Sequence, residues 1–178
     1  VLLQAIFPVS SELTANPKYK ITLAKTISYF LRYILLITAP MATILALFSK
    51  PLILTFSRPE YLGSVSLFPI LATASIVFSL GSIFYQTLFA LKQTKSYRNI
   101  MIFSTIIFLS ASIPLTYIFS ELGMAFSVLI FSIFYSALSY LTIRKLIKIS
   151  IPILSLTKII VSTIISMAIL YLLDQINS

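Results

Sequence analysis

No charged side chain occurs between Tyr61 and Leu91, a stretch of 31 residues that reads YLGSVSLFPILATASIVFSLGSIFYQTLFAL. A transmembrane helix needs about 20 mostly apolar residues, because it must cross about 30 Å of hydrocarbon at about 1.5 Å per residue. The stretch is therefore longer than a perpendicular span requires. We expect the span itself to occupy residues 64–91, preceded by a turn at the membrane interface.

Further apolar stretches on both sides of this one have the length of a span. They predict four more spans, at about 29–49, 99–120, 122–143 and 152–173. Residues 1–13 are apolar but too short to cross, so we interpret them as the tail of a preceding span, and residues 14–28 as a cytoplasmic amphipathic segment.

The predicted fold class is an all-α polytopic membrane protein. About five transmembrane helices and the tail of a sixth form one membrane domain over residues 1–178, and short polar hinges predict that neighbours pack as antiparallel hairpins. The chain begins with Val rather than Met, so we expect a piece of a longer protein or a gene whose start lies upstream; a valine-encoded alternative start is the other interpretation.

Composition excludes the main alternatives. Hydrophobic residues make up 59% of the chain and charged residues 10%, with a mean hydropathy of +1.06, whereas a soluble domain is about 45–50% apolar and about 25% charged. The chain has no His and no Cys, so zinc sites of the usual kind, thiol nucleophiles and Ser-His triads are excluded. We therefore predict no enzyme activity, no metal site and no cofactor.

Basic residues gather on one side of the membrane if the five spans alternate in direction. Of the 13 Lys and Arg residues, 11 fall on one side, and only Lys50 and Arg58 fall on the other. The positive-inside rule makes the rich side cytoplasmic and predicts a multi-pass protein of the plasma membrane. This distribution accounts for the net charge of +9, so no nucleic-acid partner is needed.

Three basic residues at spacings of seven, Lys18, Lys25 and Arg32, share one helix face that runs into the first span. One interpretation is an interfacial helix whose cations reach out to lipid headgroups. The other is a basic stripe lining a cytoplasmic vestibule for an anionic substrate. Lys25 and Arg32 are candidate substrate-binding residues on that second interpretation, and Arg32 is the better candidate because it lies deepest.

Small and polar residues form one face of the second span. They are Ala72, Ser75, Ser79, Ser82 and Gln86. Such a face is typical of a helix–helix seam, in which small residues permit close approach and hydroxyls bond across. Alternatively the face lines a water-filled cavity, where Gln86 would contact substrate.

Two more residues are functional candidates. Lys158 lies near the start of the last span, where it either extends toward the interface or faces the bundle and binds substrate. Pro40 lies in the middle of the first span; it removes one backbone hydrogen bond, so it is a candidate hinge or a tolerated kink. None of the five predicted spans contains Asp or Glu.

Several motifs, in order, resemble the C-terminal half of polysaccharide flippases, which belong to the multidrug/oligosaccharidyl-lipid/polysaccharide exporter superfamily. They are AIFPVS at 5–10, LILTF at 52–56, EYLGS at 60–64, LFPIL at 67–71, QTLFALKQTK at 86–95, IPL at 113–115 and ELGMA at 121–125. The chain departs from the pattern where Ser57 and Arg58 stand in place of Gly, and where Ser120 to Leu122 precede the single Gly123.

This resemblance implies two lobes of six or seven helices around a central cavity with alternating access. The substrate would be a lipid-linked oligosaccharide or polysaccharide precursor whose pyrophosphate is held by basic side chains. This chain would supply most of the second lobe, so its partners would be membrane lipids, the anionic glycan lipid and a missing N-terminal lobe. The alternatives are a drug exporter of the same superfamily, which would favour carboxylates in its spans, and a small non-transporting membrane scaffold or subunit.

Overall fold

The computed structural model describes residues 19–147. Four long helices dominate this part of the chain: α2 (Tyr19–Leu47), α4 (Leu67–Ala90), α5 (Thr94–Phe119) and α6 (Glu121–Leu146). Between α2 and α4 lie a short helix α3 (Ser49–Phe56) and a 3₁₀ helix η1 (Pro59–Ser66). The predicted span tail at 1–13, the predicted span at 152–173 and Lys158 lie outside the described residues.

All four long helices are long and apolar enough to cross a membrane, and the most apolar 18 residues of each have a mean hydropathy of 1.9 to 2.0. The described part is therefore an all-α membrane protein, and its long helices fall over the predicted spans at 29–49, 64–91, 99–120 and 122–143. The amphipathic segment predicted before the first span is continuous with it from Tyr19 onward, because no Gly or Pro interrupts the chain before Pro40.

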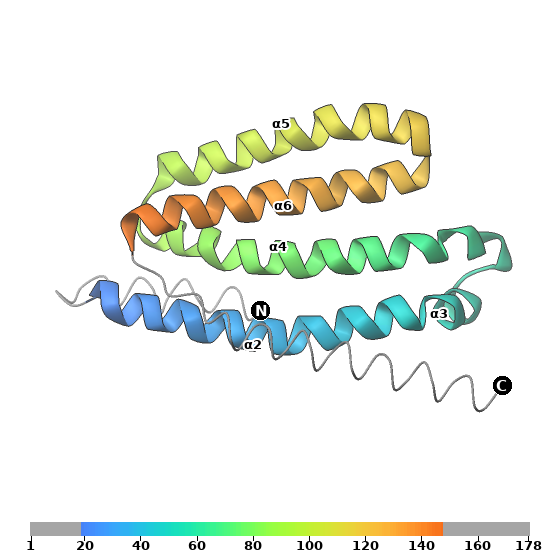
Figure 1. Ribbon diagram of the computed structural model, residues 1–178, viewed down its shortest axis with the longest axis horizontal. Coiled ribbons are helices and arrows are strands. Elements are labelled where there is room, and N and C mark those ends of the chain that lie inside the picture. Colours follow the sequence, from blue (N-terminus) through green and yellow to red (C-terminus); the bar gives the residue numbers. More distant parts are fainter. Residues whose placement is uncertain (1–18, 148–178) are drawn as a thin grey trace.

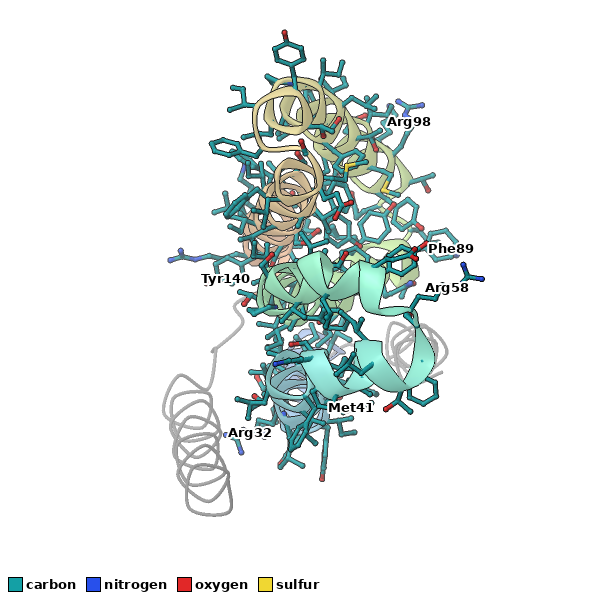
Figure 2. The ribbon with its side chains drawn as sticks, turned by 90° about the vertical axis from the view of Figure 1, so that its right-hand side faces the viewer. Arg32, Met41, Arg58, Phe89, Arg98 and Tyr140 are labelled. Carbon is teal, nitrogen blue, oxygen red and sulfur yellow. The ribbon has the colours of Figure 1, made fainter. Side chains whose placement is uncertain are left out.

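The long helices stand in a single row in the order α5, α6, α4, α2, so the described part is one helix thick (Figures 1 and 2). The prediction that every neighbour packs as an antiparallel hairpin is wrong here. Helix α6 lies between α4 and α5, and it runs parallel to α4 (Figure 1). Antiparallel contacts remain between α2 and α4 and between α5 and α6.

A glycine explains why α4 packs on α6. A Cβ atom added at Gly81 would lie 2.7 Å from the Cα of Ser136, so the two backbones approach as closely as glycine allows. Ser132 and Ser139 are also buried on α6. In lipid, helices associate through van der Waals packing, which small residues such as these permit.

Apolar and aromatic side chains pack beside this seam. At the end where α4 finishes, Leu23 and Ile27 of α2 belong to the same buried cluster as Leu88 and Ile143. Further along, the ring of Tyr135 stacks on Phe78 with centroids 5.1 Å apart, within the range of favourable aromatic pairs. The core of the row thus follows α4, which has a packed neighbour on each side.

The connection after α2 contains two short helices, α3 and η1. Helix α3 lies across the end of the row rather than along it (Figures 1 and 2), and its Leu54 and Phe56 are exposed. The capping residue of η1 is Arg58, and no side chain caps that helix. The α4 segment therefore begins with a 3₁₀ turn and becomes an α-helix at Leu67.

The turn between α5 and α6 requires unusual backbone geometry. Ser120 has φ 53° and ψ −125°, a region that glycine adopts far more readily than serine. Three residues later, a Cβ atom at Gly123 would overlap the backbone carbonyl of Leu115. The single glycine of this turn thus permits α6 to start directly against the end of α5.

Candidate functional site

Most basic residues of the described helices gather at one end of the row, while Lys50 and Arg58 lie at the other. The start of α2, the turn between α4 and α5, and the end of α6 meet there (Figure 1). The exposed cations of that turn and of the adjoining helix ends are Lys92, Lys95, Arg98, Arg144 and Lys145. This end is called the basic end below.

The two acidic residues within 19–147 lie at the opposite end. Glu60 is in η1, and Glu121 opens α6 with its carboxylate 3.4 Å from the hydroxyl of Ser64. Glu121 and Lys145 are 24 residues apart on one helix, which corresponds to about 36 Å. The cations of the basic end therefore have no carboxylate partner among the described residues.

A basic residue closes the turn at this end. The N–H of Gln93 donates to the Leu88 carbonyl and the N–H of Lys92 donates to the Phe89 carbonyl, each at 3.0 Å. Lys92 has φ 57°. This pattern is the Schellman motif, which usually places glycine at the position that Lys92 occupies.

The candidate residues Lys25 and Arg32 are both exposed on α2. They are seven residues apart, about 10 Å along the helix. Leu31, next to Arg32, lines a groove together with Phe84 and Tyr140. Arg32 therefore lies at about the same depth in the row as Phe84, which is about 9 Å along the helix axis from the end of α4. Arg32 lies on the side of α2 that faces away from α4 (Figure 2).

The third described candidate, Gln86, is half-buried on α4. Neither Gln86 nor Lys25 nor Arg32 forms a hydrogen bond or an ion pair with a residue in 19–147, and the described helices do not bring the three together as one site. Headgroup binding and substrate binding therefore remain alternative predictions for Arg32. Lys158 lies outside the described residues.

The polar face of α4 is only partly a helix seam. Ala72 and Ser82 are buried, whereas Ser75 is exposed. The hydroxyls of Ser75, Ser79 and Ser82 donate to carbonyls of their own helix at 2.7 to 2.8 Å. The close approach of α4 to α6 occurs instead at Gly81, which is not among the residues of the predicted polar face.

Pro40 does not end α2. The helix continues to Leu47, and the hydroxyl of Thr43 donates to the Ala39 carbonyl at 2.9 Å one turn away. The pyrrolidine nitrogen cannot donate to the Leu36 carbonyl, so that carbonyl lacks its usual helical donor. Pro40 thus remains a candidate hinge in a helix that is otherwise regular.

Two hollows are open on the described helices. One is the apolar groove between α2, α4 and α6, of about 340 Å³, to which Leu31 and Tyr140 belong. The other lies between α5 and α6 at the basic end, has about 370 Å³ and is lined by polar and apolar side chains together. The sequence analysis did not predict the second hollow. Its polar residues occur as two pairs spaced three apart, Ser96–Asn99 and Thr142–Lys145, and this spacing at the ends of two successive helices could have indicated a shared polar site.

No protein-family model, no curated protein and no solved structure matches the chain. What the chain does is therefore inferred from its own residues and their geometry.

Proposed function

We propose that this chain is part of a flippase that moves a lipid-linked oligosaccharide or polysaccharide precursor across the plasma membrane by alternating access, with the basic end in the cytoplasm. It acts as a carrier and not as an enzyme. The observation that carries the proposal is the distribution of charge along the apolar helices. The predicted spans within 19–147 contain no Asp or Glu, and most of the cations lie at one end of the row.

The shape of the row supports a second lobe. A layer one helix thick cannot enclose a cavity, and large apolar side chains are exposed along it, such as Tyr33 at 63% and Ile113 at 74%. Lipid covers some of this surface, and further helices would cover the rest. A missing N-terminal lobe and the predicted span at 152–173 would supply those helices.

The charge of the candidate residues supports an anionic substrate. The predicted spans at 29–49, 64–91, 99–120 and 122–143 contain the cationic Arg32 but no carboxylate that could hold a cationic drug. Glu60 and Glu121 lie just outside them, at the end opposite the basic end. A diphosphate group would pair with Lys25 and Arg32 of α2 and with Lys158 in a vestibule open to the basic end. Gln86 would contact the substrate elsewhere, because the described part of α4 does not bring it to Arg32. A drug exporter of the same superfamily is disfavoured for the same reason.

The test uses the complete open reading frame, purified and reconstituted in vesicles that contain a fluorescent lipid-diphosphate glycan. We expect the double variant Arg32→Gln and Lys158→Gln to slow leaflet movement about a hundredfold or more, because each of the two lost contacts to a charged group is worth about 1.5–3 kcal/mol and about 1.4 kcal/mol corresponds to tenfold. Lys50→Gln, at the opposite end, is the matched control and should leave the rate unchanged.

Each outcome of that experiment has a definite reading. Movement that persists unchanged in the double variant removes Arg32 and Lys158 from the site. Absence of movement in the unaltered complete protein contradicts the flippase proposal and favours the non-transporting scaffold, which the exposed apolar faces also fit.

Orientation is tested separately by labelling. Because the chain has no Cys, a single Cys introduced in place of Gln93 reports only the turn between α4 and α5. We expect an impermeant maleimide to label it only after the cells are opened, while Cys in place of Ser57 is labelled in intact cells. Labelling of position 93 from outside would invert the proposed topology.

A further inference from the structure

The hollow between α5 and α6 has polar and apolar parts in a fixed order. Ser96 lies in the first turn of α5 and Lys145 in the last turn of α6, and both line the hollow of about 370 Å³. Phe103 and Leu138 line it seven residues further into each helix, about 10 Å away along the helix axis. From Ser96 and Lys145 inward, both walls thus change from polar to apolar over the same distance, while Leu146 adds one apolar residue at the outer end.

The polar part of the hollow suits an anion. Its lining includes Lys145 and the neutral polar residues Ser96 and Asn99, without any carboxylate. Thr142 also lines it, but its hydroxyl donates to the Leu138 carbonyl of its own helix. The residue before α5, Gln93, does not cap the helix with its side chain. The uncapped N–H groups of α5 add positive potential there, but the carbonyl end of α6 lies at the same hollow and opposes it, so the attraction for an anion comes from the basic side chains.

The surroundings increase that potential. Lys95, Arg98 and Arg144 are exposed at the same end of the row, and the acidic residues of the described helices lie at the other end. The charged side chains of 19–147 that surround the hollow are therefore all basic. The volume also lies in the range of sites that hold small organic ligands, about 300–1,000 Å³.

We infer that this hollow binds one anionic phospholipid, with the phosphate beside Lys145 and Ser96 and an acyl chain along Phe103 and Leu138. A phospholipid combines a phosphate with a hydrocarbon chain directly below it, which is the order of the lining. Free phosphate would use only the polar part and leave the apolar wall unoccupied. This site is independent of the proposed transport, since it opens between α5 and α6 and shares no residue with the candidate substrate contacts.

The chain has no Trp, which permits a site-specific test. Phe103→Trp places a single tryptophan in the apolar wall, and the full chain is reconstituted in vesicles containing phosphatidylcholine and phosphatidylglycerol, either of which carries brominated acyl chains. Bromine quenches tryptophan on contact. We expect phosphatidylglycerol to occupy the position beside this tryptophan about fivefold more often than phosphatidylcholine, as measured by quenching with each brominated lipid. This is the effect expected of one or more cations acting on one anionic headgroup.

Two neighbouring basic residues provide the matched variants, each combined with Phe103→Trp. Lys145→Gln should remove the lipid preference of the introduced tryptophan, Lys145→Arg should keep it, and Arg144→Gln should keep it because Arg144 carries the same charge but does not line the hollow. Ile113→Trp in the otherwise unaltered chain, on an exposed part of α5 far from the basic end, should be quenched equally by both lipids. Each variant is first checked for a single peak in size-exclusion chromatography.

Three outcomes would overturn the inference. Equal quenching of the Phe103→Trp variant by both lipids would show that no anionic lipid is selected. Equal loss of preference in Arg144→Gln and Lys145→Gln would assign it to the general field of the basic end. Excess inorganic phosphate that abolishes the preference would assign the hollow to a free anion.

Discussion

The most apolar 18 residues of helix α4 and of helix α5 have nearly the same mean hydropathy, 2.0 and 1.9, but they differ threefold in burial: 33% of these residues are buried in α4, against 11% in α5. Helix α4 packs against α2 on one side and α6 on the other, whereas α5 ends the row and packs mainly on α6. Hydropathy therefore decides that each helix enters the membrane, but it does not decide which helix lies in the middle.

The difference between the two helices lies in their small residues. Around Gly81, α4 buries Ala74, Ser82 and Thr87, so neighbouring backbones approach closely. Helix α5 buries only Ile100 and Ser104 and exposes bulky residues over most of its surface. Because lipid is as apolar as Leu, packing against small residues is what favours a protein neighbour over a lipid neighbour.

The largest expected effect is at the α4–α6 seam. Gly81→Leu should lower the free energy of unfolding by about 3 kcal/mol, because its side chain overlaps the backbone at Ser136. Ser110→Leu on the exposed side of α5 is the matched control and should leave stability unchanged. The measurement is unfolding by sodium dodecyl sulfate followed by circular dichroism. If Gly81→Leu does not fold, Gly81→Ala should still be less stable than the unaltered chain; equal stability of all variants would contradict the seam.

A smaller effect is expected where a side chain is removed from the buried cluster. Leu88 is 0% exposed and Ile113 is 74% exposed. Leu88→Ala should cost about 2 kcal/mol, since the packing contacts are lost and a cavity remains, while Ile113→Ala should cost close to nothing. Thermal unfolding in detergent compares the two variants. Similar losses in both would mean that α5 has a packed partner on its exposed side.

The turn that joins α5 to α6 should become more stable with glycine. Ser120 has φ 53°, and strain of this kind costs about 1–3 kcal/mol per residue. Ser120→Gly should therefore raise the stability by about 1 kcal/mol, partly offset by the greater freedom of glycine in the unfolded chain. Ser112→Gly, within α5, is the control and should lower stability. A decrease in both variants would show that Ser120 is unstrained.

The smallest expected effect distinguishes two buried hydroxyls. Ser104 on α5 has no hydrogen-bond partner among the described residues, whereas Ser127 on α6 donates to the Gly123 carbonyl at 2.8 Å. Ser104→Ala should be neutral or stabilising by about 0.5 kcal/mol, and Ser127→Ala should destabilise by about 0.5–1 kcal/mol. Thermal unfolding in detergent measures the stability of both variants. A loss of stability in Ser104→Ala together with a gain in Ser127→Ala would contradict the assignment of a hydrogen bond to Ser127 alone.

Much of the fold follows from local sequence. Charge-free runs predicted the ranges of four helices, because desolvated backbone in a membrane must be helical. The arrangement of those helices could not be predicted in the same way. Whether Gly81 meets Ser136 or a side chain of α5 depends on the fit of two surfaces in space, and the hairpin prediction failed for that reason.

The candidate site was predicted less completely. Lys25 and Arg32 could be selected because their spacing defines a helix face, but what covers that face depends on residues beyond 19–147. The hollow of Ser96 and Lys145 combines the start of one helix with the end of the next. Its residues are 49 positions apart, and only the antiparallel contact of α5 and α6 brings them together.

The parallel contact between α4 and α6 has a consequence for biogenesis. Gly81 enters the membrane 55 residues before Ser136, a delay of about 3–11 s at ribosomal speeds of about 5–20 residues per second. During that interval the close-packing partner of Gly81 has not yet been synthesised. Ribosomal pausing after α5 would lengthen the time in which lipid contacts this face of α4.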